Sequence, residues 1–337
     1  MTTVNLKHLA KELGLAVSTV SRALRDSYDI GDDTKKKVMA LAHKLNYEPN
    51  PYASSLRKHK SKTIAVIVPE IANNFFSLAI NGIEDVAQEK GYHVLIYLTH
   101  ENYAKEQSIT RYLQSGRVDG VLMSVSNETN DIQHIHALKQ KNIPIVFFDR
   151  VCDNVDTTKV TTDDFESAFK GTEHLIEQGC KNIAFFSVPS FVSIGNKRML
   201  GYEEALKMHK LKVNPNYVVY DTNNAEENLK QVKRVLSGKK RPDGVFASVE
   251  KLAITTYHAC NELGIQIPKD IKVISFSNLN TASLLNPSLT TITQPAYDIG
   301  KRAATILFRS LDKKNATIMN EKVTIAATLI PRDSTRQ

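Results

Sequence analysis

The sequence predicts two kinds of fold in one chain: an all-α helix-turn-helix segment, followed by an α/β body with two doubly wound parallel sheets. Three observations lead to this prediction. Apolar residues recur at helical spacing before residue 46, continuous apolar runs alternate with amphipathic stretches from Thr63 onward, and most of the excess positive charge lies before Thr63. With 337 residues, of which 42% are apolar and 24% charged, the chain is long enough for two or three globular domains.

The N-terminal segment shows three stretches with the periodicity of short helices. Gly14 directly follows the first stretch, where a glycine ends a helix by adopting a positive φ, and Asp32 or Asp33 is expected to cap the third. The second helix is expected over 17–25. Three amphipathic helices are also consistent with a plain three-helix bundle. The side chains on the outer face must therefore distinguish a helix-turn-helix unit from such a bundle. The inward-facing residues are predicted to be Leu6, Leu9, Ala10 and Leu13, then Val20 and Leu24, and finally Val38, Leu41, Ala42 and Leu45.

The predicted outward face of the second helix carries side chains that suit a DNA major groove. Arg22 and Arg25 can each donate two hydrogen bonds to guanine O6 and N7. Ser18 and Ser21 can reach phosphates or base edges, and Val17 can contact a thymine methyl. Residues 1–62 contain 12 Lys and Arg against 6 Asp and Glu, whereas the remainder is almost neutral, with 32 against 30. The positive charge of residues 1–62 alone is also consistent with a basic terminus that is simply exposed to solvent. Together with the outward face of the second helix, it indicates a nucleic-acid partner.

Two segments of this region, LGLAVSTVSRALRD and TKKKVMALAHKLNYEPNPYASSLR, resemble the DNA-binding segment of the lactose-repressor (LacI/GalR) family. The similarity rests on the TVSR tetrad at 19–22, the LxYxPN turn at 45–50 and the A-x-x-L pair at 53–56. One departure is Ala16, where the family usually has a serine, so the cap of the second helix is expected to be weaker. The resemblance implies DNA contacts at Leu6, Ala16, Val17, Ser18, Thr19, Ser21, Arg22, Asn50, Ala53 and Leu56.

Residues 49–61 are predicted to be a hinge between the DNA-binding segment, 1–48, and the body, 62–337. The stretch from Pro49 to Arg57 is too short for a stable isolated helix. The resemblance implies a helix that orders only on DNA and presses Leu56 into the minor groove, where an apolar wedge unstacks a base step and bends the duplex. Without the preceding segment, an ordinary interdomain linker would be the simpler interpretation.

The body is predicted to contain two lobes, each with a parallel sheet that helices cover on both faces. The first lobe is expected to have strands at 64–68, 93–98, 120–125 and 145–148, with helices near 77–90, 104–115 and 131–141. The second lobe is expected to have strands at 159–162, 183–188, 217–220, 244–248 and 272–276, again separated by helices.

Ligands of such sheets bind in the crevice at the carboxyl ends of the strands. Aromatic, basic and acidic side chains follow several of the predicted strands, a mixture that suits a polar small molecule with apolar ring faces, such as a sugar or a nucleobase. Taken singly, each is equally consistent with a loop residue that faces water. The strand-end residues are Pro69, Glu70, Asn73, Asn74, Phe75, Phe76, Asp149, Arg150, Ser187, Asp221, Ser248, Ser277 and Asn278.

The body also resembles the periplasmic-binding-protein-like effector domain of the same family, through segments that include PEIANNFF, IPIVFFDR, GTEHLIEQG, PDGVFAS and LIPRDST. The resemblance implies a cleft between the lobes, with 289–311 returning to the first lobe and 323–330 to the second. The implied lobes are about 62–158 with 292–321, and about 159–291 with 322–337. The implied effector contacts are Phe75, Phe76, Asp149, Arg150, Ser193, Arg198, Asp221 and Ser277.

Three departures from the family pattern bear on the effector. The family commonly has Asn-Asp where Val249 and Glu250 stand, an aspartate at Ser277, and often an aromatic residue at Thr222. Loss of an amide and a carboxylate removes groups that bind hydroxyls, which argues against an ordinary hexose. The alternatives are a larger, charged or less hydroxylated ligand, or a weak or absent effector response.

Other classes of protein find little support in the sequence. The motifs GxGxxG, GxxxxGK[ST], GxSxG and HExxH are absent, so neither enzyme activity nor a cofactor is expected. His134 and His136 lie in a helical stretch, and the three cysteines form no CxxC pair, so no metal site is expected. A transport-type solute-binding protein would need an export signal, which the first residues do not show, and an architectural DNA binder would not need a cleft.

We therefore expect a cytoplasmic, sequence-specific transcription regulator, most simply a repressor, that binds a near-palindromic double-stranded DNA operator under the control of a sugar-like small molecule. Two copies are expected to pair through their bodies as a homodimer, since no heptad tail of the kind that makes tetramers precedes Gln337. No membrane partner is expected, because no apolar run approaches the length of a membrane span. An effector-independent or protein-co-regulated regulator, and a solute-binding protein, are the alternatives.

Overall fold

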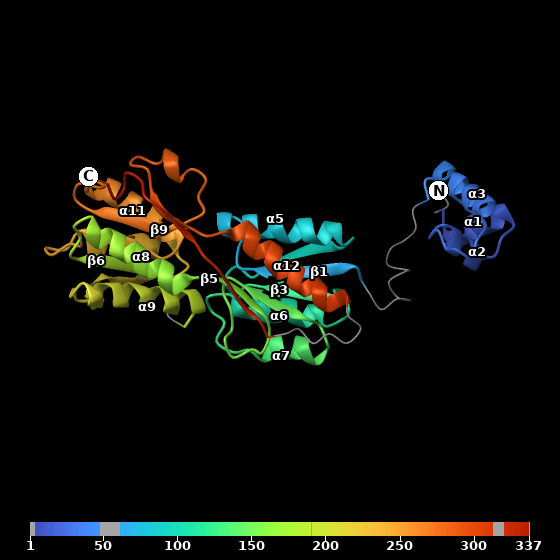
Figure 1. Cartoon of the computed structure of the whole chain (residues 1–337), viewed down its shortest axis with the longest axis horizontal. Helices are drawn as coiled ribbons and strands as arrows, with labels where there is room; N and C mark the ends of the chain where they lie inside the picture. Colours follow the sequence, from blue (N-terminus) through green and yellow to red (C-terminus); the bar gives the residue numbers. More distant parts are fainter. Residues whose placement is uncertain (1–3, 48–60, 190, 313–319, 337) are drawn as a thin grey trace. The chain divides into compact units, whose positions relative to one another are not determined.

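The computed structural model describes residues 4–47, 61–189, 191–312 and 320–336. The chain separates into two compact units, 1–61 and 62–337, which are considered one at a time. The first unit is helical and the second contains both sheets, as the sequence predicts (Figure 1).

The N-terminal unit contains three short helices around a small apolar core. They are α1 (Leu6–Leu13), α2 (Val17–Ala23) and α3 (Asp32–Lys44). Leu9, Val20 and Val38, one from each helix, are fully buried against one another, and the other predicted inward residues are buried or partly buried around them. Gly14 ends α1 with a φ of 63°, a left-handed conformation that glycine adopts without steric cost. The predicted core of this unit is therefore confirmed.

Two details at the helix ends differ from the sequence-based expectation. The second helix ends at Ala23 rather than Arg25, and Gly31 rather than an aspartate occupies the N-cap of α3. Asp32 and Asp33 instead lie in the first turn of α3, where their charges interact favourably with the positive end of the helix dipole. Ala16 is the N-cap of α2 and forms no side-chain capping bond, so the expected weakness of this cap is confirmed.

The body contains two six-stranded sheets. The first has the strand order β11-β5-β4-β3-β1-β2 and is parallel throughout, and the second has the order β12-β10-β9-β8-β6-β7, with only β12 antiparallel to its neighbour. The strands of the first sheet are β1 (Thr63–Val68), β2 (His93–Leu98), β3 (Gly120–Met123), β4 (Ile145–Phe148), β5 (Lys159–Thr162) and β11 (Lys322–Ile325). Those of the second are β6 (Ile183–Ser187), β7 (Val218–Tyr220), β8 (Gly244–Ala247), β9 (Lys272–Phe276), β10 (Thr290–Thr293) and β12 (Thr328–Ile330).

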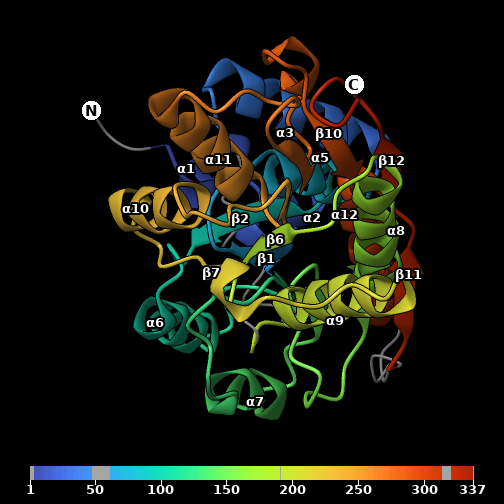
Figure 2. The same cartoon turned by 90° about the vertical axis from the view of Figure 1, so that its left-hand side faces the viewer.

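Helices cover both faces of each sheet. Figure 1 shows α5 (Asn74–Glu89) and α12 (Ala296–Asp312) on one side of the first sheet, and α6 (Tyr103–Leu113) and α7 (Gln133–Gln140) on the other. Figure 2 shows α10 (Ala225–Leu236) and α11 (Glu250–Leu263) on one side of the second sheet, opposite α8 (Asp164–Glu177) and α9 (Ser193–Met208). Alternate strand residues enter opposite apolar clusters, so the central strands are buried on both faces and form continuous apolar runs.

The assignment of one segment to a lobe was wrong, and that of two others was only partly right. The strand at 159–162, expected in the second lobe, pairs with β4 and β11 in the first sheet. The segment after Leu289 begins with β10 in the second sheet before α12 returns to the first, and the segment 322–330 is divided between β11 and β12, one in each sheet. An apolar run fits either sheet equally well, and only its pairing partner, distant in sequence, decides between them.

Three chain segments therefore cross between the lobes, and hydrogen bonds join them. Gln294, at the second crossing, donates from Nε2 to Thr162 Oγ1 at the first, over 2.8 Å. The backbone N–H of Ala327, at the third crossing, donates to Asp163 Oδ1 at the first, also over 2.8 Å. Hydrogen bonds thus tie the first crossing to the second and to the third.

Candidate functional sites: an exposed helix face and an interlobe cleft

The outer face of α2 is polar, exposed and basic. Val17 is 41% exposed, Ser18 and Arg22 are also exposed, and Thr19 and Ser21 are partly buried. Leu6 lies on α1 and packs partly against the core of the N-terminal unit. Three further predicted DNA contacts, Asn50, Ala53 and Leu56, lie outside the described residues.

The two arginines of this face are held by neighbours within their own unit. Arg22 Nη1 lies 2.5 Å from Asp29 Oδ2, and its Nε donates to the carbonyl oxygen of Ser18 over 3.4 Å. Arg25 donates to the backbone oxygen and the hydroxyl of Ser21, over 2.9 and 2.7 Å. The Arg22–Asp29 pair is exposed, so solvent weakens the attraction and the guanidinium can exchange partners readily.

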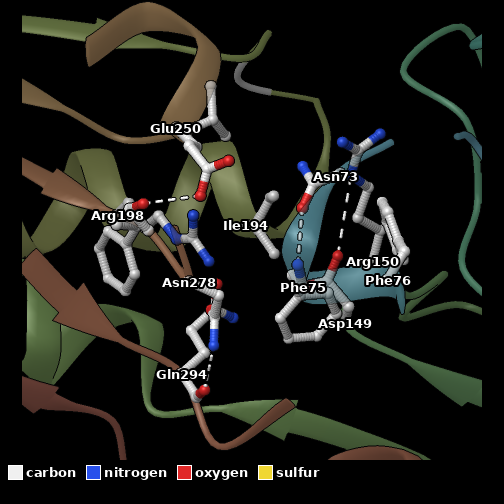
Figure 3. Close-up of a pocket in the computed structure, with 13 residues that line it drawn as sticks. Asn73, Phe75, Phe76, Asp149, Arg150, Ile194, Arg198, Glu250, Asn278 and Gln294 are labelled. Atoms are coloured by element: carbon white, nitrogen blue, oxygen red, sulfur yellow. Dashed lines mark hydrogen bonds and ion pairs between the residues drawn. The ribbon is translucent and has the colours of Figure 1, made fainter. Parts of the chain in front are cut away.

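The body contains a pocket between the two lobes, with an empty volume of about 370 Å³ that is partly open to solvent. It lies at the carboxyl ends of the strands, where the topology of two wound sheets places a ligand site. Aromatic rings, two arginines and two carboxylates converge there from both lobes (Figure 3). Its lining residues are Asn73, Phe75, Phe76, Asp149, Arg150, Ile194, Arg198, Val249, Glu250, Phe276, Ser277, Asn278 and Gln294.

Arg198 forms one wall of the pocket from α9. Its Nε donates to Asp164 Oδ1 over 2.7 Å, one Nη donates to the carbonyl oxygen of Ser248, and its guanidinium lies 3.7 Å from the centre of the Phe276 ring. The side chains of Arg198 and Asp164 are 2% and 1% exposed. Burial raises the pKa of Asp164, and the neighbouring Arg198 lowers it. The arginine is therefore fixed in one orientation before any ligand binds.

Arg150 lies on the opposite side, directly after β4. Its Nη1 donates to both oxygens of Glu101, over 2.8 and 2.9 Å, and to Asn127 Oδ1 over 3.0 Å. Its Nε has no hydrogen-bond partner in the described part of the chain and lies 3.9 Å from Asp149 Oδ2. The network leaves the Nε donor of Arg150 without a hydrogen bond beside the pocket.

Asp149 adopts an unusual backbone conformation and is almost fully buried. Its φ is +60°, in the left-handed region that aspartate tolerates better than most residues. Burial raises the pKa of its carboxyl to about 6, although Arg150 and Arg198 lower it. This strained turn directs a carboxyl group into the cleft.

Glu250 begins α11 and connects the two lobes. Its Oε1 accepts a hydrogen bond from Asn74 Nδ2 of the first lobe over 3.0 Å, and its Oε2 accepts one from Ser277 Oγ of the second over 2.6 Å. Position 277, where the family usually has an aspartate, therefore contacts a carboxylate supplied by α11.

Six of the eight predicted effector contacts line this pocket together: Phe75, Phe76, Asp149, Arg150, Arg198 and Ser277. The other two do not. Ser193 Oγ accepts a hydrogen bond from the N–H of Val151 over 3.0 Å and so joins the lobes beside the pocket. Asp221 is buried against Asn228, whose Nδ2 donates to it over 2.6 Å, and forms an ion pair with Lys251.

Several lining residues were missed or misinterpreted. Gln294 directly follows β10 and Phe276 ends β9, so the strand-end rule, applied to every strand, would have found both. Ile194 follows Ser193 at the start of α9, and no sequence pattern marked it. Glu250 was noted only as a departure from the family pattern and was not predicted to line the pocket. Its hydrogen bond with Ser277 depends on how α11 packs, which the sequence does not show.

His134 lies in α7, in agreement with the helical stretch that the sequence predicts. His134 lies 2.8 Å from the buried carboxylate of Glu106, which accounts for this histidine as a packing residue. Within the described ranges, no three His, Cys, Asp or Glu side chains are grouped as a metal would require. Among the described helices, none combines the length and apolar character that a bilayer-spanning segment requires.

Comparisons with known proteins give matches to both units. Residues 5–50 match the model "Bacterial regulatory proteins, lacI family", and residues 172–335 match "Periplasmic binding protein-like domain". The chain is 30% identical to catabolite control protein A of Priestia megaterium over 92% of its own length and 93% of that protein. It is 31% identical to the HTH-type transcriptional regulator RegA of Clostridium saccharobutylicum, over 98% and 99%.

The fold of the whole chain is also similar to a solved structure. The lac repressor dimer bound to operator and the anti-inducer ONPF superposes with a TM-score of 0.85, over 99% of each chain, at 22% sequence identity. At this identity the similarity concerns the fold.

Proposed function

Because the chain belongs to the lacI family of bacterial regulatory proteins, whose members are DNA-binding transcriptional regulators, we propose that it is a sequence-specific repressor controlled by a small-molecule ligand. The ligand would bind in the interlobe cleft and would set the affinity of the protein for one operator. Expression of the genes beside that operator would then follow the concentration of the ligand.

The observation that carries the DNA-binding part is the outer face of α2. A short helix with an exposed arginine, exposed hydroxyl groups and an exposed valine can fill a major groove and read base edges. The core of the N-terminal unit does not use Arg22, Ser18 or Val17, so these side chains are available to DNA without loss of packing. The basic charge of this unit adds a sequence-independent attraction to phosphates.

We propose a homodimer on a near-palindromic operator. One three-helix unit contacts only a short half-site, and a twofold pair of such units reads two related half-sites. The lac repressor structure, a dimer bound to operator, supports this arrangement for a chain of the same fold. A protein that acts on bacterial genomic DNA would work in the cytoplasm.

The ligand-controlled part rests on the construction of the cleft. Side chains of both lobes line it, and direct contacts join the lobes around it, including Asn74 with Glu250 and Val151 with Ser193. A ligand that inserts between these groups must change the contacts between the lobes, which gives it a different affinity for two arrangements of the body. Residues 49–61, which we propose as the hinge, connect the body to the DNA-binding unit.

The test has two steps. Selection of bound sequences from random duplexes should give one near-palindromic consensus, and a thermal-shift screen of sugars, sugar derivatives and nucleobases should find a ligand that stabilises the fold. Operator affinity is then measured by fluorescence anisotropy with and without that ligand. Uniform binding to all duplexes would contradict the DNA-binding proposal. Specific binding that no cleft ligand changes would instead support an effector-independent or protein-co-regulated regulator.

A further inference from the structure

Glu250 differs from Glu101, Asp149 and Asp164 because, among the described residues, it forms no ion pair with a basic side chain. Glu101 and Asp149 each lie within 4.0 Å of Arg150, and Asp164 pairs with Arg198 in the same way. In the described part of the chain, Glu250 forms no ion pair, and its carboxylate accepts hydrogen bonds from the neutral groups of Asn74 and Ser277. A carboxylate can accept about four hydrogen bonds, so Glu250 retains acceptor capacity on the pocket side.

The two arginines of the pocket do not make it a site for anions. Arg150 and Arg198 are already matched by Glu101, Asp149 and Asp164, all of which are buried beside them. The two arginines and these three carboxylates together carry no net positive charge. Glu250 adds a further negative charge to this group. A phosphate or carboxylate on the ligand would be repelled by this set, and a positive group would be attracted.

A second, independent observation also calls for a hydrogen-bond donor on the ligand. Asn278 lines the same pocket and is 9% exposed, and its Oδ1 has no hydrogen-bond partner within the described residues, whereas its Nδ2 donates to the carbonyl oxygen of Gln294 (Figure 3). A buried acceptor without a partner costs free energy unless the ligand supplies a donor. On the other walls, Arg150 Nε is a donor without a partner, which suits a ligand oxygen.

The walls of the pocket limit the ligand further. Phe75, Phe76 and Phe276 provide apolar surfaces for the C–H faces of a sugar ring.

We propose that the ligand of this cleft is a small hydroxylated molecule with a primary ammonium group, of which an amino monosaccharide is the simplest type, and that Glu250 selects it. The ammonium would donate to Glu250, and a neighbouring donor would satisfy Asn278. The proposal rests on the ligand-controlled function proposed above and specifies the chemical class of that ligand. Glu250 thus supplies the carboxylate that Ser277 lacks, from a different element and with a different preference.

Isothermal titration calorimetry on the full chain tests this proposal. The probes are D-glucosamine, D-galactosamine and D-mannosamine, each compared with its parent hexose and its N-acetyl derivative, at a pH at which the amine is protonated. At least one amine should bind about tenfold more tightly than its neutral counterparts, the difference expected for one charge-assisted hydrogen bond. Glucose 6-phosphate should bind more weakly than the preferred amine.

Two variants assign the preference to one residue. Glu250→Gln should reduce the affinity for the preferred amine to that for the parent hexose. Glu226→Gln, which removes an exposed carboxylate from the first turn of α10, is the matched control and should leave the preference unchanged. The comparison of each amine with its N-acetyl derivative uses only the wild-type protein, so it tests the proposal even if a variant folds poorly.

The outcomes separate this proposal from the function on which it rests. Failure of all three amines to bind, tighter binding of a hexose or of glucose 6-phosphate, or survival of the preference in Glu250→Gln overturns the assignment. If a neutral or phosphorylated sugar binds and changes operator affinity, the proposed function stands and the ammonium proposal fails. If an amine binds through Glu250 but leaves operator affinity unchanged, the ligand class is supported and the ligand control of DNA binding fails.

Discussion

Arg198 and Asp164 form an ion pair that is buried almost completely between α9 and α8, with 2.7 Å between Nε and Oδ1. The same guanidinium packs against the Phe276 ring and lines the interlobe pocket. We predict that this arginine has two roles, one in the stability of the second lobe and one in binding the ligand of the cleft. The two roles can be measured separately, the first by unfolding and the second by the response to the ligand.

We predict that Arg198→Ala lowers the free energy of unfolding by about 3–5 kcal/mol, because it leaves the Asp164 carboxylate buried without a positive partner. The double variant Arg198→Met with Asp164→Asn removes both charges and should recover most of that loss. Urea unfolding measures both. The double variant should nevertheless fail to respond to the cleft ligand. Equal stability of the two variants would show that the loss in Arg198→Ala does not come from an unpaired Asp164 carboxylate.

We predict that Asp29 competes with DNA for Arg22. The two side chains pair at the exposed face of the N-terminal unit, with 2.5 Å between Nη1 and Oδ2. Asp29→Asn should therefore raise the affinity for duplex DNA, since the guanidinium no longer has to exchange a carboxylate for a base. Asp26→Asn is the matched control, because it removes the same charge from the same unit but its carboxylate pairs with Lys35.

We expect Asp29→Asn to gain about two- to fivefold more operator affinity than Asp26→Asn, in line with the small contribution of an exposed pair. Fluorescence anisotropy at fixed salt concentration measures the difference, because a change of salt would alter both affinities. An equal gain in the two variants would mean that only net charge matters and that the Arg22–Asp29 contact does not restrain the arginine.

Arg22 is expected to read one base pair. Arg22→Ala should cost about 1–3 kcal/mol at one operator position and should relax the preference there, because a guanidinium that bonds guanine O6 and N7 rejects the other bases. The measurement is a competition series with every single-base variant of the selected operator. If the variant instead loses the same factor on all duplexes, Arg22 contacts a phosphate and specificity lies elsewhere on α2.

Most of the strands could be predicted from the sequence, because a strand that is buried on both faces consists of a continuous run of apolar residues. The strands around Val66, Phe147 and Phe185 are examples, and each lies where the sequence places it. The sheet to which β5 belongs could not be predicted, since its pairing with β11 joins residues 159–162 to residues 322–325. Such a pairing is a property of the assembled fold rather than of the local pattern.

The candidate site could also be predicted only in part, because the sequence indicates which residues end the strands but not how the helices pack around them. Strand-end positions such as Arg150 are fixed by the topology of a parallel sheet, so they could be named in advance. Ser193 and Asp221 were also named, but their side chains contact Val151 and Lys251, and these pairings follow from the packing of whole elements. The contact of Glu250 with Ser277 is of the same kind, and it changes the expected chemistry of the cleft.

Asp149 should make the stability of the body depend on pH. Its carboxyl has a pKa of about 6 in the folded protein, where burial disfavours the charge, against 3.8 as the ordinary value. As the pH falls through about 6, the folded state binds a proton that the unfolded state binds only near 3.8. Protonation in this window therefore favours folding, and the same contribution is lost as the pH rises again.

We predict that wild-type protein gains stability relative to Asp149→Asn, by up to about 3 kcal/mol, when the pH is lowered from 7 to 4. The amide of the variant cannot titrate, so other acid-sensitive groups affect both proteins and cancel in the difference. Asp153→Asn, which removes an exposed carboxylate from the loop after β4, is the control and should show a difference that does not vary with pH in this way. Unfolding by urea at several pH values gives the curve. A difference that stays constant between pH 7 and 4, or one that shrinks as the pH falls, would show that Asp149 is not held in an environment that disfavours its charge.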